Sequence, residues 1–196
     1  MAQLPHYRKS RIPSSAKKVF EGVLFDVHQW DQELFDGTHA TFEMVSRADS
    51  AVVFPVLPDG RILLIEDTQP NRAMEITAPA GRVEPGETPV EAAWRELLEE
   101  TGYRPESMEL LYTDAPVSKV DVVVHVYIGK NAEKIQEPEI ESGELIIPKP
   151  VTFDQLIELA CDLESPFSGP RFRLLALDAK THPRKMDALR KKFSVA

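Results

Sequence analysis

The chain has 196 residues, 42% of them hydrophobic, and a formal net charge of −9 at pH 7. This length suits one domain with a buried core, and the acidic balance argues against nucleic-acid binding by bulk electrostatic attraction. The single cysteine, Cys161, excludes an internal disulfide, and the scattered histidines form no evident zinc site or catalytic triad. No signal-peptide pattern or bilayer-length apolar run is present, so we expect a cytoplasmic protein without a membrane partner.

The first segment, residues 1–18, is polar, contains prolines and carries several basic side chains. We expect it to form a loose N-terminal arm. A tail that binds nucleic acid is the weaker alternative, because no aromatic residues alternate with the basic ones. Residues 19–196 are expected to form a single domain.

Strands are predicted from residue 19 to 47, where apolar residues partly alternate and Asp36-Gly37 is typical of a hairpin turn. A second hairpin is predicted from the apolar run 51–57, the Pro58-Asp59-Gly60 turn and the run that starts at residue 61. The continuous apolar stretch of that last strand indicates burial on one or both faces.

The strongest local signal predicts a helix over residues 89–101. Thr88 is a good N-cap, a proline occupies the first helical position, and Glu91 completes a capping box. Gly102 follows the last periodic residue, where a left-handed C-cap is expected.

The predicted helix has one apolar side and one acidic side that carries Glu96, Glu99 and Glu100. Arg95 is the only basic residue of the helix, and Glu91, one turn earlier, is expected to hold it. The residues alone leave two interpretations open: a solvated acidic surface, or a site for a hard cation such as Mg²⁺ or Mn²⁺.

Beyond this helix, residues 131–144 form a predicted exposed acidic loop, in which Glu141 or Glu144 could approach a metal site. The loop at 165–170 could border a substrate cleft. The remaining predicted elements are strands at 108–112, 120–127 and 145–147, and helices at 152–163, 171–180 and 184–193.

The stretch from Gly81 to Tyr103 resembles the Nudix box, G-x5-E-x7-R-E-U-x-E-E-x-G-U, where U is a bulky aliphatic residue. The glycines, the arginine and the glutamates all match at the right spacing, and only the aromatic Tyr103 departs from the pattern. The resemblance implies an α+β fold, an α/β/α sandwich in which helices flank a mixed sheet behind N-terminal antiparallel strands. It also implies an enzyme that cleaves diphosphate linkages.

The resemblance further implies a Mg²⁺ site, with Mn²⁺ as an alternative cation. Its ligands would be the side chains of Glu96 and Glu100 and the carbonyl of Ala80. Glu99 would be either a further ligand or the base that orients water. Arg95 would hold the glutamates in place, Glu87 would brace the loop, and Gly81 would permit a turn.

The lead-in Thr77-Ala78-Pro79-Ala80-Gly81 resembles the E-L-P-A-G of the branch that hydrolyses ADP-ribose and nucleoside-diphosphate sugars. The R-Q-Y-R run found in that branch is replaced by the residues at 66–69, so Arg72 is the expected substrate-binding arginine. Asp121 is the candidate for the loop carboxylate that helps activate water, although a solvent-facing strand charge explains it equally well.

The predicted partner is thus a small nucleotide, and relatives imply a homodimer, with the N-terminal arm as an alternative dimer contact. Nucleoside triphosphates and dinucleoside polyphosphates are alternative substrates. The alternative outside enzymes is a nucleotide-binding regulatory module without turnover, which the intact glutamates of the box argue against. A protein-interaction scaffold has no specific support in the sequence.

Overall fold

The structure is a computed structural model that describes residues 11–70, 72–140 and 142–194. The N-terminal part contains β1 (Lys17–Glu21), β2 (Asp26–Glu33), β3 (His39–Ser46), β4 (Ser50–Pro55), β5 (Ile62–Thr68), β6 (Glu75–Thr77) and β7 (Ala80–Arg82). Then follow α1 (Pro89–Thr101), β8 (Tyr103–Arg104), β9 (Ser107–Asp114), β10 (Val120–Asp121), β11 (Val124–Lys130), β12 (Glu133–Lys134) and β13 (Leu145–Val151). The chain ends with α2 (Phe153–Cys161), α3 (Pro170–Lys180) and α4 (Pro183–Phe193).

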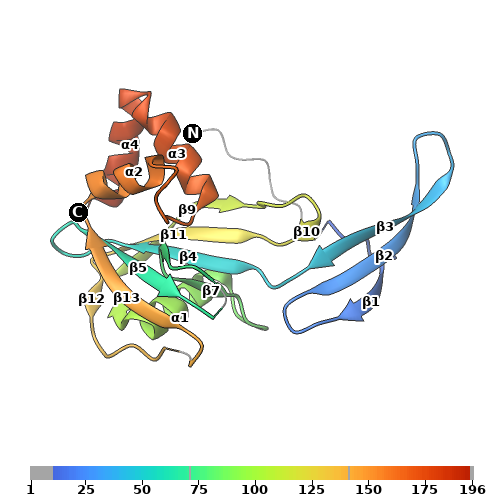
Figure 1. Ribbon diagram of the computed structural model, residues 1–196, viewed down its shortest axis with the longest axis horizontal. Helices are drawn as coiled ribbons and strands as arrows, with labels where there is room; N and C mark the ends of the chain where they lie inside the picture. The colour runs from blue at the N-terminus through green and yellow to red at the C-terminus, as the bar shows by residue number, and fades with distance from the viewer. Residues whose placement is uncertain (1–10, 71, 141, 195–196) are drawn as a thin grey trace.

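A central mixed sheet with the strand order β7-β4-β11-β9 forms the middle layer of the body. Strand β11 is parallel to β4 and antiparallel to β9. Figure 1 shows α1 on one side of the strands and α2, α3 and α4 together on the other. This arrangement confirms the expected α+β sandwich of a mixed sheet between helices.

The alternation of β4 explains why helices cover both faces of the sheet. Ala51 and Val53 pack with the apolar side of α1, whereas Phe54 points into the core beneath α2, α3 and α4. On the α1 side the contacting residues are mostly small, and Ala92 and Ala93 are fully buried. The other side carries the larger apolar cluster.

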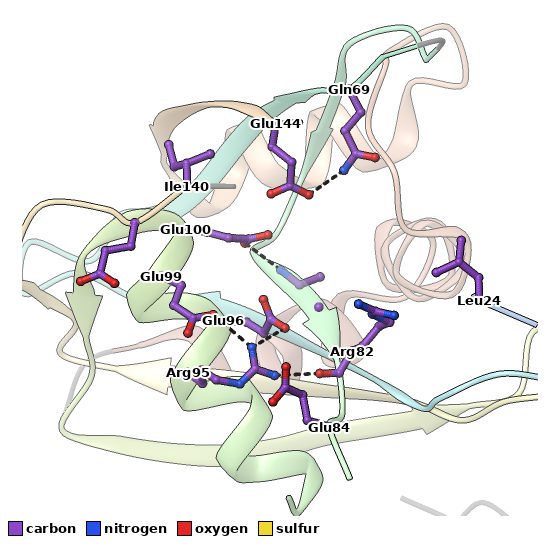
Figure 2. A pocket seen from close by; sticks show the side chains of 13 residues that line it. Leu24, Gln69, Arg82, Glu84, Arg95, Glu96, Glu99, Glu100, Ile140 and Glu144 are labelled. Carbon is purple, nitrogen blue, oxygen red and sulfur yellow. Dashed lines mark hydrogen bonds and ion pairs between the residues drawn. The ribbon is translucent and has the colours of Figure 1, made fainter. Parts of the chain in front are cut away.

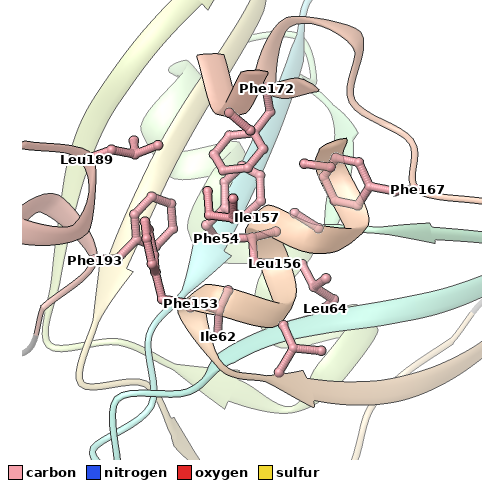
Figure 3. Close-up of a cluster of buried hydrophobic side chains, with 14 of the residues drawn as sticks. Phe54, Ile62, Leu64, Phe153, Leu156, Ile157, Phe167, Phe172, Leu189 and Phe193 are labelled. Atoms are coloured by element: carbon pink, nitrogen blue, oxygen red, sulfur yellow. The ribbon is translucent and has the colours of Figure 1, made fainter. Parts of the chain in front are cut away.

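This larger cluster is built around phenylalanines from several elements (Figure 3). The ring centroids of Phe54 and Phe172 lie 4.7 Å apart, and Phe193 closes the group at 5.7 Å from Phe54. Tilted aromatic pairs at such separations add to the free energy gained by burying the rings. The cluster therefore ties the three C-terminal helices to the central sheet.

Strand β5 does not pair with β4 as a regular hairpin. The Asp59-Gly60 turn is present, but only an isolated bridge between Val56 and Ile62 joins the two strands. Beyond it, β5 lies between β13 and β6 in a separate sheet. This corrects the prediction of a simple second hairpin and brings β5 and β13 to the side of α1.

The N-terminal strands form a sheet of their own, in the order β1-β2-β3-β10, that projects from the body (Figure 1). The Asp36-Gly37 turn joins β2 and β3 as predicted, and Gly37 has a φ of 81°. Strand β1 begins at Lys17, within the segment predicted to be a loose arm. Residues 1–10 of that arm lie outside the described residues.

The three C-terminal helices lie close to their predicted positions. A capping box at Thr152 and Gln155 starts α2, and prolines occupy the first turns of α3 and α4. Within the described residues, no helix has the length and apolar character needed to cross a membrane.

Candidate active site

Helix α1 has the bounds that its caps predict. Thr88 accepts a hydrogen bond from the Glu91 backbone, and the Glu91 carboxylate accepts one from the Thr88 backbone at 2.8 Å. At the other end Gly102 adopts a φ of 74°, and its N–H bonds the Leu98 carbonyl. The expectation that Glu91 holds Arg95 was wrong, because its carboxylate is used by Thr88.

Arg95 instead binds three other glutamates. Its guanidinium donates to Glu87 at 2.9 Å, to Glu96 at 2.8 Å and to Glu99 at 3.0 Å, and also reaches the Arg82 carbonyl at 2.8 Å. The hydrogen bond from Arg95 lowers the pKa of Glu87. The same bond, together with those to Glu96 and Glu99, raises the pKa of Arg95. Arg95 therefore ties the loop before the helix to the acidic face (Figure 2).

Gly81 is required for space rather than for a turn. It lies in β7, and a Cβ placed on it would come within 1.9 Å of the Glu96 carboxyl group. Gly81 is also absent from the glycines with positive φ among the described residues. The missing side chain lets the Glu96 carboxylate lie directly against the β7 backbone.

Glu96 and Glu100 are the most deeply placed carboxylates of the helix. Burial raises the pKa of Glu96, and Arg95 opposes that rise. Burial also raises the pKa of Glu100 well above its usual range, although the Ala80 N–H donates to its carboxylate at 3.0 Å. Both sites therefore favour a positive group that would compensate the buried charge.

The acidic face of α1 borders a cavity of about 550 Å³, and Figure 2 shows Gln69 and Glu144 on its opposite side. The Gln69 amide donates to Glu144 at 3.0 Å, which orients this carboxylate. The described residues that line the cavity are Leu24, Gln69, Ala80, Gly81, Arg82, Glu84, Arg95, Glu96, Glu99, Glu100, Glu139, Ile140 and Glu144.

The structure brings together Ala80, Arg95, Glu96, Glu99 and Glu100, the residues predicted from the box and its lead-in. Two other predicted residues lie elsewhere. Arg72 is not among the described residues that line the cavity, and its guanidinium pairs with Asp67 and Glu75. Asp121 belongs to β10 at the edge of the projecting sheet, where its carboxylate accepts from the Arg11 backbone at 3.1 Å.

Sequence reasoning missed the contribution of β5 and Gln69 to this site. Asp67 is buried at 7% exposure, and its charge is one of those that raise the pKa of Glu100. A signal for Asp67 existed, because by strand alternation it shares a face with the buried Leu63 and Ile65. Glu144 was singled out only as one of two loop glutamates, since nothing in the sequence fixes where that loop folds.

The donors around the cavity suit a hard divalent cation. Most of them are glutamate carboxylates, and carboxylate oxygens are ligands that Mg²⁺ and Mn²⁺ prefer. In the described part of the chain, no three acidic, histidine or cysteine side chains already surround one point that could hold a metal ion. Cation binding would therefore need the carboxylates to exchange some of their present hydrogen bonds, including those to Arg95.

The sandwich fold, with a box helix whose glutamates border an acidic cavity, defines a hydrolase of the Nudix type. Comparison with known proteins supports this class: the model of the NUDIX domain matches residues 46–171. The chain belongs to the NUDIX domain family.

Relatives with named activities cover most of the chain. It is 28% identical over 148 residues to an ADP-ribose pyrophosphatase of Bacillus subtilis, an alignment covering 73% of this chain and 79% of that protein. It is also 28% identical over 145 residues to a methanol dehydrogenase activator of Bacillus methanolicus, covering 72% and 78%. The crystal structure of an ADP compounds hydrolase superposes with a TM-score of 0.65 at 20% identity, covering 90% and 96%, and supports the fold.

Proposed function

We propose that this protein is a Mg²⁺-dependent pyrophosphohydrolase that cleaves the diphosphate linkage of ADP-ribose or a similar nucleotide sugar. The products would be a nucleoside monophosphate and a phosphorylated second group. The observation that carries this proposal is the gathering of Glu96, Glu99 and Glu100 with Glu144 around one cavity. The relative named as an ADP-ribose pyrophosphatase supports the substrate class.

The charges of the cavity explain why a cation belongs to the proposal. A diphosphate is anionic, and Arg82 and Arg95 are the only basic residues among the described residues that line the cavity. Arg95 already binds three glutamates. Bound Mg²⁺ would neutralise phosphate oxygens and lower the pKa of a water molecule.

The side chains of the chain itself would then position and deprotonate that water. Glu96 and Glu100 would be ligands together with the Ala80 carbonyl, and Arg95 would keep the helix glutamates in register. The water oxygen would bond one phosphorus, and the bridging oxygen would leave with the other phosphoryl group. The water protons would pass to a carboxylate and to solvent.

Glu99 and Glu144 are the carboxylates best placed to act as the base, since both line the cavity and Glu99 is 44% exposed. Asp121, the residue predicted for this role from the sequence, serves as the comparison. We expect Glu144→Gln to lower kcat at least about 10-fold, within the range for general-base removal. Asp121→Asn should change kcat little. If kcat instead falls in Asp121→Asn and not in Glu144→Gln, Asp121 is the base.

Arg72 remains our predicted substrate-binding residue. Its guanidinium donates to Asp67 at 3.1 Å and to Glu75 at 3.0 Å, so a phosphate would have to replace one of these partners. Arg72→Gln should then raise KM more than it lowers kcat. An unchanged KM would remove Arg72 from the substrate site.

The central test is hydrolysis of a substrate panel with Mg²⁺ and with Mn²⁺. The panel should contain ADP-ribose, several nucleotide sugars, a nucleoside triphosphate and a dinucleoside polyphosphate. Glu96→Gln should abolish turnover of the preferred class. Glu158→Gln, on helix α2 across the central sheet, is the matched control that should retain it.

The second candidate is a regulatory module that binds a nucleotide without turnover, which the relative named as an activator favours. Under that function the panel would show binding without products, and Glu96→Gln would leave the binding unchanged. Such a result would reject the catalytic proposal.

Homodimerisation and a cytoplasmic location are further parts of the proposal. The first turn of the projecting sheet exposes Phe20, Val23 and Leu24, with Val23 at 96% exposure, as an apolar surface that a second copy would cover. Sedimentation equilibrium should give twice the monomer mass. Phe20→Ser with Val23→Ser should dissociate the dimer, whereas Leu163→Ser, at another exposed apolar position, should not.

A further inference from the structure

Arg173 of α3 binds the backbone of a loop rather than an acidic side chain. Its guanidinium donates to the carbonyls of Asp162 at 2.6 Å, Ser165 at 2.9 Å and Phe167 at 2.7 Å. It also lies over the Phe167 ring, 5.5 Å from the ring centroid. Asp162 is the C-cap of α2, so the negative end of that helix stabilises the cation. No ion pair of Arg173 is present within the described residues.

The chain held in this way, residues 165–168, adds a partner to β6. The Ile76 N–H donates to the Pro166 carbonyl at 2.9 Å, and the Ser168 N–H donates to the Ile76 carbonyl at 2.7 Å. Phe167, a member of the phenylalanine cluster in Figure 3, lies between these two bonds and forms a parallel bridge with Ile76. Strand β6 has only three residues and pairs with β5 along its other edge. The 165–168 segment therefore occupies the edge that β5 leaves open.

Strand β6 continues directly into the wall of the acidic cavity. Two residues connect it to β7, and the first of them, Ala78, is 1% exposed. Strand β7 begins at Ala80, which lines the cavity and whose N–H donates to Glu100 at 3.0 Å. Because this short connection is tightly packed, a displacement of β6 at Ile76 would reach the backbone that contacts Glu100.

We propose that Arg173 is a positioning residue of the active site, because it clamps the 165–168 segment onto β6 and thereby fixes Ala80 against Glu100. This inference rests on the proposed function, in which Ala80 and Glu100 take part in the reaction. The planar fork of a guanidinium binds several carbonyls at once, whereas lysine presents a compact ammonium group. The clamp therefore depends on the shape of the side chain as well as on its charge.

The first test compares Arg173→Lys with Arg190→Lys. Arg190, on α4, also lies over a phenylalanine ring, 4.5 Å from the Phe153 centroid, but its guanidinium donates to Asp154. We expect Arg173→Lys to lower kcat at least about 10-fold, because a misplacement of about 1 Å can cost about 100-fold. KM should change less, since neither Arg173 nor the 165–168 segment is among the described residues that line the cavity. Arg190→Lys should keep the wild-type kcat.

Chemical rescue separates the clamp from a purely structural role. In Arg173→Ala, guanidinium chloride well below its denaturing concentration should restore part of the lost kcat, whereas sodium chloride at the same ionic strength should not. If Arg173 only stabilises the fold, its variants should have a lower Tm, an unchanged kcat per folded molecule and no rescue. If Arg173→Ala does not fold, the kcat of Arg173→Lys decides between the two roles.

Hydrogen exchange of single amides measures the coupling without substrate or metal. In Arg173→Lys the amides of Ile76, Ser168 and Ala80 should exchange faster than in wild type, because each donates a hydrogen bond that the clamp supports. The Val126 amide, in β11, should exchange at the wild-type rate. Faster exchange at Ile76 and Ser168 with an unchanged Ala80 amide would overturn the proposal, because the effect of the clamp would then end at β6.

Two results distinguish this inference from the proposed function. An active hydrolase whose kcat per folded molecule is unchanged in Arg173→Lys would reject the positioning role and leave the proposed function intact. A wild-type protein that turns over no substrate of the panel would reject the proposed function, whereas the amide exchange would still show whether Arg173 fixes Ala80.

Discussion

The two faces of the central sheet are built on opposite principles. On one face, phenylalanines from β4, α2, α3 and α4 form a cluster with ring centroids as close as 4.7 Å. On the other, small side chains of α1 pack closely on the sheet, and its far side gathers carboxylates. The difference indicates that the first face stabilises the fold, whereas the second face lowers the stability because it holds like charges close together.

Removing a ring from the apolar face should have the largest effect. Phe172 is 1% exposed and contacts Phe54, Phe167 and Phe193. Phe172→Ala should lower the free energy of unfolding by about 3–5 kcal/mol, measured by urea denaturation. The kcat of the molecules that remain folded should be unchanged. A selective loss of kcat would show that the two faces are not separable.

The matching change on the acidic face is Glu100→Gln. We expect it to affect activity far more than stability. Replacement of groups that support metal ligands costs about 10–100-fold, so loss of a ligand should lower kcat/KM by at least about 100-fold. The metal-free variant should be no less stable than wild type, because the buried charge is gone. A strongly destabilised variant would mean that Glu100 is a structural residue.

The raised pKa of Glu100 also predicts how the stability of the metal-free protein depends on pH. Its pKa is raised in the folded state, so the group favours folding while protonated, and this contribution is lost as pH rises from the unfolded value to the folded pKa. Metal-free wild type should therefore lose stability over that window relative to Glu100→Gln. Parallel stability curves for the two proteins would contradict the assignment.

Gly81→Ala tests the closest contact on the acidic face. The new methyl group would meet the Glu96 carboxyl group, which is the far end of a flexible side chain, so Glu96 would move away from the β7 backbone. We expect weaker Mn²⁺ binding with little loss of stability. Gly86 has open space around its Cβ position, so Gly86→Ala, which is strained only through its φ of 89°, is a useful control for metal binding.

We expect the smallest effect from replacing the N-cap threonine of each capping box. Thr88→Ala and Thr152→Ala should each cost about 1 kcal/mol of stability, as is typical of N-cap replacement. Only Thr88→Ala should also lower activity, because α1 carries the acidic face. Equal activity in both variants would show that fraying of the α1 N-terminus does not reach the glutamates.

The sequence was most informative where structure depends on neighbouring residues. Caps, prolines and turn glycines predicted α1, the β2–β3 hairpin and the C-terminal helices close to their observed bounds. The spacing of the box also predicted which helix glutamates gather. These signals are local, because a cap or a turn satisfies backbone groups only a few residues away.

The rest of the site depends on contacts between distant segments. Gln69 and Glu144 meet because β5 pairs with β13, and no local pattern predicts the register of that pairing. For the same reason the sequence suggested a β4–β5 hairpin and drew attention to Asp121, which the fold carries to another sheet. Gly81 was assigned to a turn because the close approach of Glu96 is visible only in three dimensions.

The narrow attachment of the projecting N-terminal sheet affects how the molecule should exchange its amide hydrogens. Strand β10 contributes two residues to β3, supported by Arg11, whose guanidinium reaches the carbonyls of Val117 and Ser118. Because the described residues of this sheet meet the later part of the chain mainly along the short strand β10, we expect the sheet to open as a cooperative unit without unfolding the body. Amides of β2 and β3 should then exchange well before those of β4 and β11, and association with a second copy should slow them selectively.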